Sequence, residues 1–222
     1  SWVDYEYKDS KFAILRQAIY SLRETKRLLT VNVYGLGAMT HPGDLALVLQ
    51  KAVTETLRKH KIELAVPTDY ENYIEQIRQN PEIWNHLIDT HTALSSVVAD
   101  SDQLAESLKT GDLGIFHRVS DTLREAQLDI RLNNDNIKQW LCEVQDRLTE
   151  LGTYNGLLIV WDEFTDVMTD AIGVPVLKQL QEVAQKFMNE DCNSYLFLIS
   201  HPSAFNGIDS EQLKQTDGRY HR

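Results

Sequence analysis

A short apolar run that ends in two carboxylates constrains the fold more than any other part of this sequence. Residues 156–163 read GLLIVWDE, with no charged side chain before Asp162. A strand that is apolar at consecutive positions is typical of a parallel sheet that is covered on both faces. Parallel strands are joined by crossover connections, which are usually helices. The run therefore predicts an α/β protein with a parallel sheet.

Two more strands and three helices are expected around this run. Residues 195–199 (YLFLI) predict a second buried strand, and residues 175–188 between the two strands carry apolar side chains at helical spacing. Residues 28–34 (LLTVNVY) predict another strand, which follows a helix at 11–27. A further helix is expected from Pro42-Gly43-Asp44 to about Lys59, with Asp44 as its N-cap.

The middle of the chain has a different pattern. From about Tyr70 to Glu150 helical periodicity dominates, with breaks near residues 80, 111 and 133, and no strand is expected. This arrangement predicts a large helical subdomain inserted between two α/β sections. The expected boundaries are residues 1–65, 66–152 and 153–222.

Composition excludes some classes of function. The chain has 33 acidic and 22 basic residues, a net charge of −11, which argues against a free-standing nucleic-acid binder. Its longest apolar run is far shorter than a membrane span needs. Cys142 and Cys192 lack metal-ligand spacing, so we expect reduced thiols in a cytoplasmic protein. Both ends of the sequence look like cuts in a longer polypeptide.

Polar side chains follow the two late strands directly. Asp162 and Glu163 end the first, and Ser200 and His201 end the second. In open α/β sheets, ligands bind beyond the carboxyl ends of the strands, so adjacent strands would bring these residues into one cleft. Carboxylate oxygens suit Mg²⁺, and a second carboxylate can position an attacking water.

These residues carry a family resemblance. LLIVWDE resembles the Walker B motif of P-loop ATPases that use a catalytic glutamate, and FLIS resembles the sensor strand that follows it. The resemblance implies a partial parallel P-loop sheet with a large inserted helical subdomain, and ATP and Mg²⁺ as cofactors. It further implies that Asp162 holds Mg²⁺, usually through a water, and that Glu163 orients the water that attacks the γ-phosphate.

Three further residues have roles that depend on the subgroup. If the chain is similar to AAA+ proteins, Ser200 is the sensor that contacts the attacking water or the γ-phosphate. If it is closer to the ABC and SMC group, His201 resembles the switch histidine, but the LSGGQ-like signature of that group is missing. Arg219 resembles an arginine finger that would reach into a neighbouring subunit of a homo-oligomer. The alternatives without a catalytic role are that Ser200-His201 only forms a turn and that Arg219 is a solvated surface charge.

One part of the family pattern is missing. No GxxxxGK[ST] occurs, and residues 35–40 (GLGAMT) lack the lysine that ends such a loop. We therefore expect the phosphate-binding loop upstream of Ser1, as in large AAA+ or STAND-like ATPases, and no hydrolysis by this piece alone. An acidic ATPase with a helical insertion resembles, in general terms, the motor subunits of bacterial anti-phage defence systems.

Two other functions remain open at this stage. In the first, the helical middle binds a protein partner and the acidic pair has no catalytic role. In the second, which is weaker, Asp162 and Glu163 belong to a metal-dependent nuclease. A nuclease would need a third carboxylate or an ExK motif after a strand, and none is suitably placed.

Overall fold

A parallel sheet of three strands organises the part of the chain that the structure describes. The structure, a computed structural model, describes residues 13–34, 39–41, 43–128, 136–165, 167, 172–188 and 192–200. The strands are β1 (Leu28–Val33), β2 (Gly156–Trp161) and β3 (Tyr195–Leu198), in the order β1-β2-β3. Both pairs are parallel, so the predicted α/β class is confirmed.

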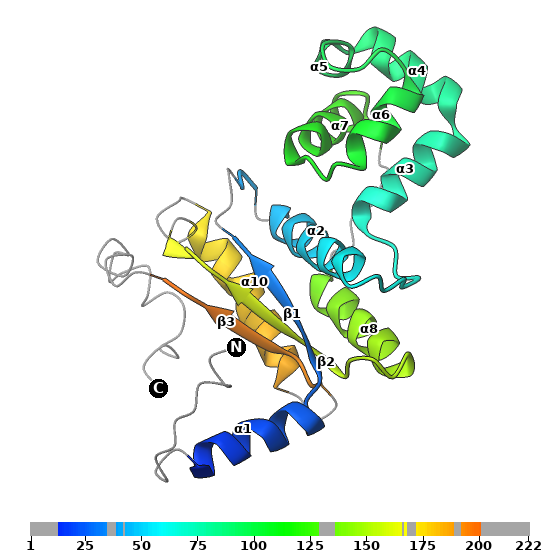
Figure 1. Cartoon of the computed structure of the whole chain (residues 1–222). Helices are drawn as coiled ribbons and strands as arrows, with labels where there is room; N and C mark the ends of the chain where they lie inside the picture. Colours follow the sequence, from blue (N-terminus) through cyan, green and yellow to red (C-terminus); the bar gives the residue numbers. More distant parts are fainter. Residues whose placement is uncertain are drawn as a thin grey trace.

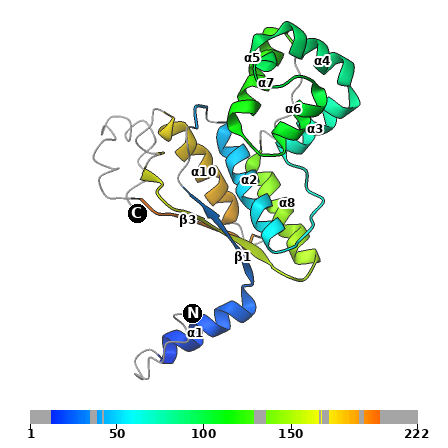
Figure 2. The ribbon, with the colours of Figure 1, turned by 45° about the horizontal axis from the view of Figure 1, so that its top comes forward.

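Three helices cover one face of this sheet (Figures 1 and 2). They are α2 (Asp44–Lys59), α8 (Ile137–Glu150) and α10 (Gly173–Phe187). Alternate residues of β1 and β2 face them and are almost completely buried, namely Leu29, Val31, Val33, Leu157, Ile159 and Trp161. Because side chains alternate along a strand, one set of positions forms the core and the other set faces away from these helices.

The other face of the sheet is partly open. Leu158 and Val160 of β2 are half-buried, and Tyr195 and Phe197 of β3 are 41% and 57% exposed. The expectation that YLFLI is buried on both faces is therefore wrong for this structure. The side chains of β3 are exposed because β3 is an edge strand in the sheet that the structure describes. Helix α1 (Ala13–Thr25) precedes β1.

A second hydrophobic core lies in the chain between β1 and β2. It is built by α3 (Asp69–Gln79), α4 (Pro81–Thr90), α5 (Thr92–Ser95), α6 (Ser101–Leu108) and α7 (Leu113–Glu125), which group away from the sheet in Figure 1. Thr68 and Glu71 form a capping box at the start of α3. Asp100 and Asp112 cap α6 and α7 through their side chains. We call α3–α7 the helical cluster.

Two details differ from the expected helical pattern. The helical pattern of the middle region is interrupted at His91, the C-cap of α4, so that Val97 is 39% exposed and Val98 is buried. Helix α8 packs its apolar side chains into the core of the sheet and not into the helical cluster.

In the described part of the chain, no helix is long and apolar enough to cross a membrane.

Candidate functional site at the carboxyl rim of the sheet

Backbone hydrogen bonds continue past the end of β2 and hold both neighbouring strands to it. The amide of Asp162 donates to the carbonyl of Val33 at 2.9 Å, and the amide of Ile199 donates to the carbonyl of Trp161 at 2.8 Å. The amide of Phe164 then donates to the carbonyl of Ile199 at 2.9 Å. The segments that follow β2 and β3 therefore lie side by side at one edge, which we call the carboxyl rim.

Asp162 and Glu163, the rim pair, form a tight turn at this edge. Glu163 has a φ of 55°, a left-handed conformation that costs a residue with a side chain about 1 kcal/mol. The amide of Glu163 donates to Oδ1 of Asp162 at 2.9 Å, which closes the turn locally. Trp161 and Phe164 on either side are buried and meet edge to face, with ring centroids 5.2 Å apart. The two aromatic rings anchor the turn and leave both carboxylates exposed.

The other left-handed residues show why Glu163 is unusual. Among the described residues, Lys61 and Gln127 also have positive φ values, of 57° and 56°. Each of them follows the C-cap of a helix, α2 and α7 respectively, where a left-handed residue commonly ends the helix. Glu163 follows a strand, so that explanation does not apply to it. Strained backbone of this kind is often found at functional sites.

The rim brings together three of the predicted site residues. Asp162 and Glu163 are exposed beyond β2, and Ser200 is half-buried beyond β3. The pairing of Trp161 with Leu198 places these segments in register. His201 and Arg219, the other two predicted residues, lie outside the described residues.

The rim pair offers only part of a metal coordination shell. In the described ranges, no group of three His, Cys, Asp or Glu side chains is placed to hold a metal ion. Mg²⁺ usually keeps several waters and takes one or two carboxylates together with phosphate oxygens. The exposed carboxylate of Asp162 would supply one oxygen ligand of such a shell.

A cleft of about 860 Å³ opens beside the carboxyl end of β1. Its lining includes Tyr34 and Thr40 from the segments after β1, Lys51 of α2, and Asp112 and His117 from the helical cluster. Nζ of Lys51 donates to the carbonyl of Gly111 at 3.1 Å, so this amine is already engaged. The cleft therefore marks where the helical cluster meets α2 and the carboxyl end of β1.

Asp44 connects the segment after β1 to the helical cluster. It was predicted to be the N-cap of α2, but this is wrong, because Gly43 occupies the N-cap position and Asp44 is the first helical residue. Oδ2 of Asp44 accepts the amides of Thr40 and His41 at 2.9 and 3.0 Å. Nε2 of His117 donates to Oδ1 at 2.7 Å. The sequence gives no local signal for this last contact, which joins residues 73 positions apart.

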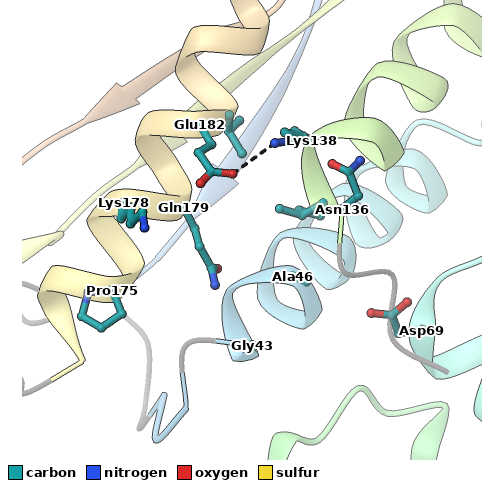
Figure 3. Close-up of a pocket in the computed structure, with 11 residues that line it drawn as sticks. Gly43, Ala46, Asp69, Asn136, Lys138, Pro175, Lys178, Gln179 and Glu182 are labelled. Atoms are coloured by element: carbon teal, nitrogen blue, oxygen red, sulfur yellow. Dashed lines mark hydrogen bonds and ion pairs between the residues drawn. The ribbon is translucent and has the colours of Figure 1, made fainter. Parts of the chain in front are cut away.

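A second hollow lies between α2, α8 and α10 (Figure 3). It measures about 390 Å³, and its lining includes Lys138, Lys178, Asp69 and Glu182. Lys138 and Glu182 point toward each other, and their Nζ and Oε2 atoms are 3.1 Å apart. The two lysines and two carboxylates balance in charge, so this hollow favours neither an anionic nor a cationic ligand.

Comparison of the chain with protein-family models, with curated proteins and with solved structures found no match. The residues at the rim and their geometry are therefore the basis for a functional assignment.

Proposed function

We propose that this chain is the Walker B and sensor section of an ATP-hydrolysing P-loop protein, whose phosphate-binding loop lies outside the chain. The observation that carries the proposal is the adjacency of the rim pair and Ser200 at the ends of neighbouring parallel strands. A ligand beyond these strand ends would meet two carboxylates and a hydroxyl together. In this proposal the helical cluster is part of a subdomain inserted into the ATPase core.

Each rim residue has a distinct role in this proposal. Asp162 holds the Mg²⁺ ion through its exposed carboxylate, either directly or through a water. Glu163 accepts a proton from, and orients, the water that attacks the γ-phosphate. Ser200 donates a hydrogen bond to that water or to the γ-phosphate. His201 and Arg219 remain predictions for a γ-phosphate contact and an arginine finger.

The open face of β3 supports a larger sheet. Parallel strands are normally covered on both faces, yet Tyr195 and Phe197 are exposed on a strand that is apolar throughout. Further strands and helices of the same ATPase core would cover these side chains. The strand that carries the phosphate-binding loop is the element that the proposal requires.

The competing reading is a non-enzymatic module in which the helical cluster binds a protein. Residues 69–125 contain eleven acidic and four basic side chains, which would suit a basic protein surface. This reading gives the carboxylate of Glu163 no role and does not account for its left-handed backbone. The two readings differ in whether a change at Glu163 affects ATP turnover.

The decisive experiment uses the full-length polypeptide with Glu163→Gln. Glutamine keeps the size of the side chain but cannot accept the proton, so we expect phosphate release to fall at least about 10²-fold. Binding of Mg-ATP, measured by equilibrium dialysis, should remain close to that of the parent protein. The matched control is Glu125→Gln, an exposed carboxylate at the end of α7, which should hydrolyse ATP normally.

Two outcomes would reject the proposal. Full hydrolysis by Glu163→Gln would remove the catalytic role of this carboxylate. Absence of Mg-ATP binding by the folded full-length parent protein would remove the ATPase assignment altogether and favour the protein-binding module.

A further inference from the structure

The two cysteines of the chain are fifty positions apart in sequence but come together in the fold. Cys142 lies on α8, and Cys192 lies just before β3. Sγ of Cys192 donates to Oε1 of Gln145 at 3.2 Å. Gln145 is three residues after Cys142 on α8, so the two side chains are neighbours on one face of the helix. Contact with Gln145 therefore places Cys192 beside Cys142.

The segment that carries Cys192 is fixed against α8. Oε1 of Gln145 also accepts the amide of Asn193 at 2.9 Å and the hydroxyl of Ser194 at 2.8 Å. The same Ser194 hydroxyl accepts the amide of Leu157 at 3.0 Å. This network holds the start of β3 to both α8 and β2, so the approach of the two thiols is built into the fold.

The surroundings of the two thiols are consistent with direct contact. Both cysteines are half-buried. Burial is the largest cause that raises the pKa of the Cys142 thiol to about 11. The charge of Cys192 and a hydrogen bond between the two thiols act in the same direction. Lys186 of α10 opposes this rise. Cys142 is therefore a poor first nucleophile at neutral pH, because little of it is thiolate.

Cys192 faces a surface groove that a reagent can enter. It lines a groove of about 490 Å³ together with Lys26, Met188 and Tyr195. Met188 is 84% exposed, so the groove opens to the surface. Cys142 does not line this groove. A small oxidant would thus meet Cys192 first and Cys142 second.

We propose that Cys142 and Cys192 form a reversible intramolecular disulfide that links α8 to the start of β3. With a low-molecular-weight disulfide such as glutathione disulfide as the oxidant, the Cys192 thiolate attacks one sulfur and a glutathione thiolate leaves. The Cys142 thiolate then attacks the Cys192 sulfur and expels the second glutathione thiolate. The protein loses two electrons and two protons, and the oxidant gains both as two glutathione thiols.

This bond would enclose β2, the rim pair and α10 in one covalent loop. Loop closure reduces the entropy of the unfolded chain, so oxidation should stabilise the β2–α10–β3 unit. For a loop of this length and a protein of this size, the melting temperature should rise on the order of 10 °C. This inference does not depend on the proposed ATPase activity.

The experiment treats the folded, reduced chain with excess glutathione disulfide. We expect a mass lower by two hydrogen atoms, with the Cys142 and Cys192 peptides linked in a non-reducing digest. Dithiothreitol should restore the original mass and melting temperature. Because Cys142 must lose a proton to complete the bond, the rate should rise about tenfold per pH unit between neutral pH and its pKa.

Single-cysteine variants separate the two steps. Cys142→Ser should stop at the mixed disulfide and carry one glutathione on Cys192. Cys192→Ser should react much more slowly, since little of its remaining thiol is thiolate at neutral pH. The inference is overturned if the folded parent protein accumulates two glutathiones, or forms disulfide-linked dimers, or closes its internal bond only in denaturant.

Discussion

Gly156, the first residue of β2, should tolerate no side chain. A Cβ atom built there would lie 1.9 Å from the carbonyl oxygen of Asn193 and 2.8 Å from Cδ2 of Leu28. The first contact is with backbone, which cannot rotate away. Asn193 cannot withdraw freely either, because Gln145 accepts its amide at 2.9 Å. Gly156→Ala must therefore push β2 and the segment before β3 apart.

We expect Gly156→Ala to lower the free energy of unfolding by about 3 kcal/mol, the upper end of the range for overpacked sites. This corresponds to a fall of roughly 6–12 °C in the melting temperature of a chain of this size. Gly152→Ala is the matched control, because a Cβ atom there meets nothing within 4 Å and only its φ of 69° is unfavourable. That variant should lose about 1 kcal/mol. Urea unfolding followed by tryptophan fluorescence measures both, and equal losses in the two variants would refute the steric reasoning.

Two further predictions concern the junction between α2 and the helical cluster. Burial raises the pKa of the Tyr70 hydroxyl far above its ordinary value of 10.0. The contribution of this neutral hydroxyl to the free energy of unfolding is therefore complete below pH 10 and is lost as the pH rises through the folded-state pKa. Tyr70→Phe removes the hydrogen bond to the carbonyl of Gly111, so its free energy of unfolding at neutral pH should be about 1 kcal/mol lower than that of the parent protein. When urea unfolding is repeated at alkaline pH, the free energy of unfolding should fall less in Tyr70→Phe than in the parent protein. Asp44→Ala leaves the amides of Thr40 and His41 without their acceptor and should lower stability by about 2–4 kcal/mol, whereas Asp44→Asn, which keeps an acceptor oxygen, should lose less. A loss below about 0.5 kcal/mol in Asp44→Ala would contradict a structural role for this carboxylate.

The strands could be predicted because their signals are local. β2 and β3 are runs of consecutive apolar residues, and β1 is rich in branched residues. The helix between β2 and β3 makes parallel pairing the natural arrangement. The polar residues at the strand ends then had to share one rim. The sequence alone therefore predicts that Asp162, Glu163 and Ser200 lie at one rim, as the structure has them.

Contacts between distant segments could not be predicted in the same way. An apolar stripe shows that α8 is buried on one side, but it does not show whether the partner is the sheet or the helical cluster. The contact of His117 with Asp44, and that of Cys192 with Gln145 next to Cys142, depend on how separate segments pack. The sequence predicts reduced thiols, and both cysteines are free in the structure, but the sequence does not show that they are neighbours.

Both ends of β2 have unusual backbone requirements, and they differ in what they imply. At Gly156 the requirement is met by the residue type, since glycine allows the close approach of Asn193. At Glu163 the residue type does not meet the backbone requirement, because glycine or asparagine would adopt a φ of 55° at lower cost. A helix cap after the strand would also be served by a residue without this cost, such as serine or asparagine. A glutamate at this turn is therefore better explained by a task for its exposed carboxylate than by the folding of the turn.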